Sequence, residues 1–323
     1  MEYRFLGSTG IRVSQLCMGT MTFGNEADKQ ESAAMFNRCR DAGINFFDCA
    51  NVYSQGEAEK ILGGLISGSR DELVITSKVW GQMGMDINAK GLSRRNIVAS
   101  VEASLKRLNT SYIDIYFLHR FDPHTALEET FATLDNLVAQ GKIRYIGASN
   151  FAAWQIAKTL GLSALHGWAA LQCIQPMYNI VKRQAEVEIL PLAQAENIGV
   201  VAYNPLGGGL LTGKYGHKIE SSKNRLGRVE IYKKRYGDDW MLDAATRYKT
   251  FARDNGFNPV SLAVAWVASH PGITSPIMGA RNVGQLEDSL KALEIDMTKE
   301  LYQKIATLAP APAPATDRTD DFR

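Results

Sequence analysis

Short apolar runs alternate with longer amphipathic stretches along most of the chain. The apolar runs lack polar–apolar alternation, which is typical of parallel strands buried on both faces of a sheet. We expect strands at 16–21, 45–50, 73–80, 112–119, 143–150, 171–175, 199–206 and 275–279. Helical spacing follows these runs over 28–43, 56–66, 93–109, 126–142, 151–161, 185–197, 239–255, 259–270 and 282–293. Asp28 and Ser93 are placed to cap the first and third of these helices.

Eight strand–helix units in a chain of this length predict a (β/α)8 TIM barrel, the α/β fold in which parallel strands close into a cylinder. An open, doubly wound sheet is the alternative. Residues 3–14 contain a glycine-centred turn between two short apolar pieces and predict an N-terminal β-hairpin. We expect one domain over 1–310, with long loops on its carboxyl face. An Ala/Pro-rich and then charged tail covers 311–323.

The composition excludes several functional classes. The chain has 323 residues, of which 45% are hydrophobic and 22% charged, and its formal net charge is +2. Such a balance indicates neither a nucleic-acid partner nor a membrane surface, and no pattern indicates an oligomeric state. No apolar run reaches about 18 residues, and no signal region opens the chain, so we expect a cytoplasmic protein. The cysteines are expected to be reduced, buried thiols: Cys17, Cys39, Cys49 and Cys173.

Polar residues stand at the ends of several predicted strands. They are Asp48, Lys78, His119, Ser149 with Asn150, and Gln175. Each has an ordinary explanation when taken alone, such as a loop cap, a surface lysine or a satisfied core histidine. In a barrel, however, these ends meet at one face, where buried charges can pair with one another. Together they predict a functional site at the carboxyl face.

Several stretches resemble the aldo-keto reductases. Residues 46–63 carry the run D-x-A-x-x-Y-x-x-G-x-x-E, and a strand lysine and a strand histidine follow in 73–80 and 112–119. The likeness continues through 142–151 and 200–215 and covers nearly the whole chain. It is closer to the branch that includes potassium-channel β subunits and many bacterial reductases.

The resemblance implies a catalytic tetrad of Asp48, Tyr53, Lys78 and His119. Carbonyl reduction needs a hydride and a proton, and Tyr53 would supply the proton and accept it in the reverse reaction. The Lys78 ammonium favours the phenolate and so would lower the pKa of Tyr53. Asp48 would pair with Lys78, and His119 would orient the substrate oxygen. This chemistry needs no metal ion.

The resemblance also implies a nicotinamide cofactor at the strand ends, with NADPH favoured over NADH. The implied contacts are Gly19, Thr20, Met21, Asp48, Ser149, Asn150, Gln175, Tyr203, Asn204, Pro205, Leu206, Gly207, Gly209, Lys214, Arg225, Gly279, Arg281, Gln285, Asp288 and Ser289. Ser149, Asn150 and Gln175 match carboxamide ligands, although a helix N-cap would explain Ser149 and Asn150 equally well. Tyr203 matches the aromatic ring that stacks on the nicotinamide.

The preference for NADPH depends on the segment that follows the last strand. Arg281 is placed for the 2′-phosphate, at a helix N-terminus where anions are favoured. Arg225 is a candidate second phosphate ligand. Asp288 and Ser289 depart from the family's usual Glu-Asn pair, which weakens the expected contact with adenine.

Residues 208–215, GGLLTGKY, come within one residue of a Walker A loop, with Tyr215 where a Ser or Thr would bind magnesium. No helical period follows Lys214, so a P-loop phosphotransferase is disfavoured. The resemblance instead brings this glycine-rich backbone to the cofactor pyrophosphate.

Tyr53, Trp80 and His119 would line the substrate pocket, with loops 80–91 and 216–240 around it. An apolar or aryl aldehyde, ketone or alcohol would suit these side chains. Two functions remain open, namely an NADPH-dependent carbonyl reductase and a cofactor-binding regulatory subunit with little turnover. The channel β subunits often carry Asn at the position of His119, so His119 favours the enzyme.

Overall fold

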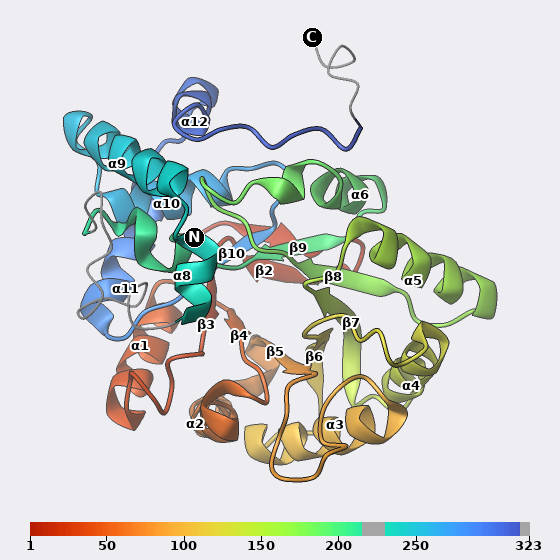
Figure 1. Ribbon diagram of the computed structural model, residues 1–323. Coiled ribbons are helices and arrows are strands. Elements are labelled where there is room, and N and C mark those ends of the chain that lie inside the picture. The colour runs from red at the N-terminus through yellow and green to blue at the C-terminus, as the bar shows by residue number, and fades with distance from the viewer. Residues whose placement is uncertain (215–229, 317–323) are drawn as a thin grey trace.

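Eight parallel strands close into a barrel in the order β10-β3-β4-β5-β6-β7-β8-β9 in the computed structural model, which describes residues 1–214 and 230–316 (Figure 1). The closed barrel confirms the predicted (β/α)8 fold over the open sheet. The strands are β3 (Cys17–Gly19), β4 (Phe46–Asp48), β5 (Val74–Val79), β6 (Ile113–Leu118), β7 (Ile143–Ser149), β8 (Leu171–Gln175), β9 (Gly199–Ala202) and β10 (Ser275–Met278).

The predicted hairpin, β1 (Tyr3–Phe5) and β2 (Arg12–Ser14), closes the amino-terminal end of the barrel. Its Leu6 and Val13 are fully buried among the side chains that fill the barrel interior. Gly7 has a φ of 53°, and a Cβ there would lie 2.6 Å from the backbone nitrogen of Gly199, so only glycine fits. The opposite end, where the strands terminate, is left for the loops.

Helices surround the barrel, as Figure 1 shows, and a second apolar core lies between helices and strands. The helices are α1 (Lys29–Asp41), α2 (Glu57–Ile66), α3 (Arg94–Leu108), α4 (Leu127–Ala139), α5 (Ala153–His166), α6 (Ile189–Ala195), α8 (Glu230–Tyr236), α9 (Asp239–Asp254), α10 (Pro259–Ala268), α11 (Val283–Leu290) and α12 (Lys299–Ala306). Short 3-10 helices are η1 (Tyr53–Gly56), η2 (Arg70–Glu72), η3 (Gln184–Glu186), η4 (Gly207–Thr212) and η5 (Lys291–Glu294).

Local signals set several of these boundaries. The Asp28 carboxylate accepts the backbone N–H of Glu31 at 2.8 Å, and the Ser93 hydroxyl accepts that of Asn96 at 3.3 Å, so both predicted caps are confirmed. Helices α8 and α12 were not predicted. The α12 side chain Ile305 is buried, and Tyr302 stacks on Trp266 of α10 with ring centroids 4.9 Å apart. Tertiary packing therefore stabilises α12.

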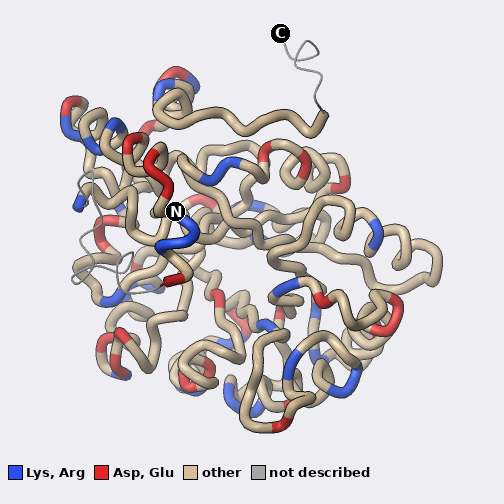
Figure 2. The backbone as a smooth tube through the Cα atoms, in the orientation of Figure 1, with Lys and Arg blue, Asp and Glu red and all other residues tan. Residues whose placement is uncertain are grey.

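The surface and the cysteines agree with the composition. Figure 2 shows basic and acidic residues interspersed over the helices. None of the described helices combines the length and the apolar character that a bilayer crossing requires. All four cysteines are free, buried thiols, as predicted.

Candidate active site

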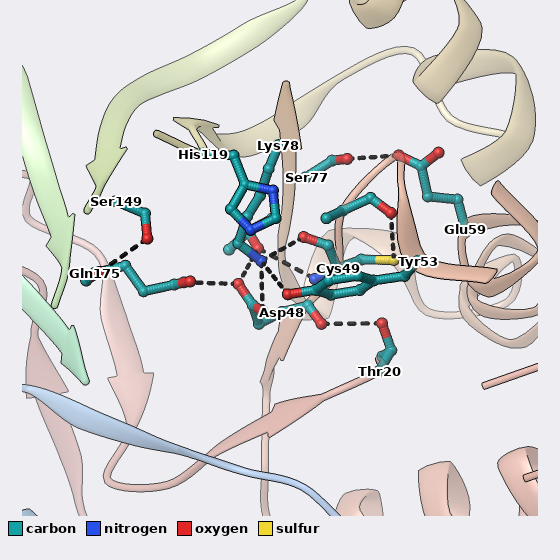
Figure 3. Close-up of polar contacts among 12 residues, drawn as sticks. Thr20, Asp48, Cys49, Tyr53, Glu59, Ser77, Lys78, His119, Ser149 and Gln175 are labelled. Carbon is teal, nitrogen blue, oxygen red and sulfur yellow. Dashed lines mark hydrogen bonds and ion pairs between the residues drawn. The ribbon is translucent and has the colours of Figure 1, made fainter. Parts of the chain in front are cut away.

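A buried lysine forms the centre of the site at the carboxyl end of the strands. Lys78 lies on β5 and is fully buried. Its ammonium donates to the Asp48 carboxylate at 2.6 Å, to the Cys49 carbonyl at 2.8 Å and to the Tyr53 hydroxyl at 3.2 Å (Figure 3). An ammonium has three protons, and each one here has an acceptor. This arrangement offsets the cost of burying the charge.

The Asp48 carboxylate is satisfied on both oxygens. One oxygen binds Lys78, while the other accepts the Thr76 hydroxyl and the Gln175 side-chain amide, each at 2.8 Å. Asp48 lies opposite both Gly19 and Thr76 in the parallel ladders, which explains why groups from separate strands reach it. Thr76 was missed in the sequence, although its spacing of two residues from Lys78 places both side chains on the same face of β5.

Tyr53 reaches this centre because the chain turns sharply behind it. Ser54, Gln55 and Gly56 all have left-handed backbone conformations, with φ of 48°, 55° and 90°. The Ser54 hydroxyl donates to the Phe23 carbonyl at 2.7 Å and holds the turn against the β3–α1 connection. Non-glycine residues seldom adopt this conformation. The strained turn therefore positions the tyrosine hydroxyl.

Burial raises the pKa of Tyr53 above its ordinary value, and the nearby Lys78 ammonium acts in the opposite direction. The ammonium has the predicted effect, but the expectation of a net lowered pKa is wrong because burial outweighs it. Burial lowers the pKa of Lys78, but Asp48 and Tyr53 raise it by a larger amount, so the net shift is upward. At neutral pH, Tyr53 is therefore a protonated donor beside a charged lysine.

His119 faces Tyr53 directly after β6. The two rings lie edge to face, with centroids 6.1 Å apart and planes at 80° (Figure 3). Burial lowers the pKa of His119 to about 3, and the positive charges of Lys78 and Arg120 act in the same direction. The imidazole is therefore neutral at pH 7 and has one N–H to donate. The Tyr53 hydroxyl and the His119 imidazole are thus two hydrogen-bonding groups on neighbouring rings.

Ser149, Asn150 and Tyr203 form a hydrogen-bonded chain beside His119. The Asn150 amide donates to the His119 carbonyl and to the Ser149 hydroxyl, both at 2.9 Å, and its oxygen accepts the Tyr203 hydroxyl at 2.7 Å. The Ser149 hydroxyl donates to the Gln175 carbonyl at 2.9 Å. Helix α5 has Ala152 as its N-cap, so the helix-cap explanation of Ser149 and Asn150 is wrong.

The end of β3 borders the same centre. The Thr20 hydroxyl and backbone N–H both donate to the Asp48 carbonyl, at 3.0 and 2.9 Å. A Cβ on Gly19 would lie 2.7 Å from Ile277, whereas the side chain of Met21 is exposed. Gly19 and Thr20 are thus closely packed at this border, whereas Met21 is partly exposed.

The glycine-rich loop follows β9. Asn204 is left-handed, Pro205 is buried and Leu206 packs against the core. Gly207, Gly208 and Gly209 have φ of 58°, 65° and 101°, so side chains at these positions would be strained. A Cβ on Gly208 would lie 2.5 Å from the Tyr232 ring. Lys214 ends this described stretch, whereas Tyr215 and Arg225 lie outside the described residues.

The segment between β10 and α11 contains Gly279 and Arg281. The Arg281 guanidinium forms an ion pair with Glu26 at 2.9 Å, and its backbone N–H donates to the Gln285 side chain at 3.2 Å. Asp288 instead accepts from Asn258, the N-cap of α10, at 3.1 Å. Ser289 is buried, and its hydroxyl has no partner among the described residues. Arg281 therefore contacts Glu26 and Gln285, whereas Asp288 contacts Asn258 of another helix.

Aromatic side chains follow the ends of β5, β6 and β7. Trp80 is half-buried after β5, and the Arg120 guanidinium lies over its ring, 4.9 Å from the centroid. Phe121 contacts Phe151 and Trp154 edge to face, with centroids 5.5 and 6.1 Å apart. Phe121, Phe151 and Trp154 were not predicted as neighbours, because they come from separate segments of the chain. Met85 of loop 80–91 is 98% exposed, so it does not pack.

The residues present fit a dinucleotide. Left-handed glycines let backbone N–H groups approach phosphates, and a guanidinium near a helix N-terminus suits an anion. Across the described residues, no group of three or more His, Cys, Asp or Glu side chains is placed to hold a metal ion.

Proteins of known sequence are similar to this chain over nearly its whole length. The family described as "Aldo/keto reductase family" matches residues 15–310. An "uncharacterized oxidoreductase" of Bacillus subtilis (strain 168) is 35% identical over 98% of each chain. A "probable voltage-gated potassium channel subunit beta" of Oryza sativa subsp. japonica is 36% identical over 100% of each. A "putative aryl-alcohol dehydrogenase" of Schizosaccharomyces pombe is 31% identical over 92% of this chain and 93% of its own.

Proposed function

The chain belongs to the aldo/keto reductase family, and we propose that it reduces an aldehyde or ketone to an alcohol with NADPH, reversibly. An oxidoreductase activity agrees with the family and with the relatives' names. One observation carries the finer proposal: the Lys78 ammonium binds Asp48 and Tyr53 at once, beside a neutral His119.

The cofactor supplies the hydride when it is bound. The Tyr53 hydroxyl gives its proton to the substrate oxygen, so that hydride and proton together convert the carbonyl into an alcohol. The phenolate that remains is stabilised by the charge of Lys78, whose nitrogen lies 3.2 Å from the Tyr53 hydroxyl in the structure. In the reverse direction the phenolate takes the proton back.

Asp48 and His119 support this transfer in different ways. Asp48 pairs with Lys78 at 2.6 Å and keeps it charged despite its burial. His119 is neutral, so its N–H can hydrogen-bond the substrate oxygen without competing with Tyr53 as a proton source. In this proposal Thr76 and Gln175 position Asp48 through their 2.8 Å hydrogen bonds.

We assign the cofactor to the strand ends, to the glycine-rich loop after β9 and to the segment between β10 and α11. Gly207, Gly209 and Lys214 would hold the pyrophosphate, and Arg281 the 2′-phosphate. Tyr203 would support the nicotinamide ring, while Ser149 and Asn150 would hold its carboxamide. Asp288 and Ser289 are poor candidates for adenine contacts, since one binds Asn258 and the other is buried.

An aryl or apolar carbonyl is the proposed substrate class. Trp80 directly follows β5, and Phe121 lies two residues after His119 in the chain and contacts Trp154; such rings bind apolar groups. The name of the Schizosaccharomyces pombe relative points in the same direction. The buried free thiols suit a reducing compartment such as the cytoplasm.

A regulatory, cofactor-binding subunit is the second candidate, because relatives named as potassium channel β subunits are 36 and 38% identical. An assay of purified protein against a panel of aldehydes, ketones and alcohols, with both cofactors, separates the two. Turnover supports the enzyme. Cofactor binding without any turnover favours the regulatory subunit, and absence of cofactor binding overturns both.

A further inference from the structure

Arg281 is held by a carboxylate from another segment of the chain. The Glu26 side chain, in the connection between β3 and α1, lies 2.9 Å from the guanidinium. Side chains of Glu26 and Arg281 are 30 and 40% exposed, so a ligand can approach the pair. The residue proposed to bind the 2′-phosphate therefore already has an anionic partner.

Two further contacts keep the Glu26 segment against residues 280–283. The Thr22 hydroxyl donates to the Ala280 carbonyl at 2.7 Å. The Glu31 carboxylate accepts the backbone N–H of Val283, the first residue of α11, at 2.7 Å. The Glu26–Arg281 pair is thus part of a docked segment that brings two carboxylates to the start of α11.

Dinucleotide sites use these two kinds of side chain for opposite purposes. A carboxylate accepts hydrogen bonds from the ribose hydroxyls of NADH, whereas an arginine accommodates the 2′-phosphate of NADPH. A carboxylate beside a phosphate is repelled, while a guanidinium binds the phosphate with two parallel hydrogen bonds. This chain has both side chains, and they are bound to each other.

We propose that Glu26 determines cofactor preference by competing with the 2′-phosphate of NADPH for Arg281. NADPH must replace the Glu26–Arg281 pair and bring its 2′-phosphate close to the Glu26 carboxylate, whereas NADH leaves the pair intact. Because the pair is partly exposed, its effect is moderate and it tempers the preference for NADPH without abolishing it. The proposal rests on the proposed function only in that a nicotinamide dinucleotide binds here.

Glu26→Gln tests the competition by direct binding, without turnover. Dissociation constants for NADPH and NADH are measured by quenching of tryptophan fluorescence and by calorimetry. We expect Glu26→Gln to tighten NADPH binding about fivefold, as for a partly exposed charge pair, and to change NADH binding by less than about twofold. Glu72→Gln, which removes a carboxylate from the Arg40 pair before β5, is the matched control and should change neither constant.

Comparing the double variant Arg281→Ala, Glu26→Gln with Arg281→Ala alone shows whether Glu26 acts through Arg281. If Glu26 acts by occupying Arg281, the gain for NADPH disappears when Arg281 is absent. An equal gain in both backgrounds, an equal change for both cofactors, or no change at all would overturn the inference. If the unaltered protein binds neither cofactor, the proposed function itself fails.

Discussion

Thr76 and Lys78 lie two residues apart on β5, and they donate to different oxygens of the same carboxylate, that of Asp48. The alternation of side chains along a strand places both on one face, and the closed barrel brings the end of β4 beside them. The charge of Lys78 and the hydroxyl of Thr76 together orient Asp48. The position of the ammonium next to Tyr53 depends on this shared acceptor.

Thr76→Val should weaken the support of Asp48 while preserving the shape of the side chain. The carboxylate oxygen loses one of its two 2.8 Å donors and keeps only Gln175, so we expect a loss of about 1–3 kcal/mol in the free energy of unfolding. Denaturant titration measures this loss. Thr125→Val, which removes a partly exposed hydroxyl that donates to Asp122, should cost less. An equal or smaller loss at Thr76 would contradict the role given to it.

Tyr53→Phe removes the proposed proton donor and keeps the ring. We expect kcat to fall by about 10²- to 10⁴-fold, the usual contribution of general acid catalysis, with the Kd for NADPH nearly unchanged. Steady-state rates and fluorescence titration measure the two quantities. Tyr3→Phe, which removes a hydroxyl that binds Gly43 beneath the barrel, should leave both unchanged. A Tyr53→Phe variant with near-normal kcat would refute the assignment.

His119 should make the protein less stable in mild acid. Its pKa is lowered from 6.5 to about 3 on folding, chiefly by burial. Below pH 6.5 the unfolded state takes up the proton and the folded state does not. The contribution of His119 is therefore full above pH 6.5 and is lost progressively between pH 6.5 and 3.

His119→Gln should remove this part of the pH dependence. Between pH 7 and pH 5 we expect the unaltered protein to lose about 1–2 kcal/mol more unfolding free energy than the variant. Urea titrations at the two pH values provide the comparison. Some dependence will persist, because burial also lowers the pKa of His270. Identical losses in both proteins would show that His119 titrates normally.

Arg281→Ala should change the use of the two cofactors unequally. The guanidinium is proposed to meet the 2′-phosphate, which NADH lacks, so KM for NADPH should rise about tenfold or more while KM for NADH changes little. Initial rates with each cofactor, at one ionic strength, test this difference. Parallel changes in both KM values would mean that Arg281 supports the loop and does not read the phosphate.

Much of the fold was predictable because its signals are local. Each strand lies within its predicted apolar run, and the caps of α1 and α3 are visible in the sequence. Helix α12 was missed because its stability comes from contacts such as Tyr302 with Trp266, which lie far apart in the chain. The left-handed Ser54 and Gln55 were also beyond prediction, because neither residue type signals that conformation.

The sequence by itself determined which residues end the strands, and hence that Asp48, Lys78 and His119 share one face of a barrel. Only the tertiary structure decided how their charges balance. Burial raises the pKa of Tyr53 by more than Lys78 lowers it. Likewise, an arginine at position 281 suits a phosphate by its side-chain type, but its pairing with Glu26 appears only when two distant segments meet. Local patterns specify elements and candidate groups, whereas desolvation and pairing depend on neighbours that the folded chain brings together.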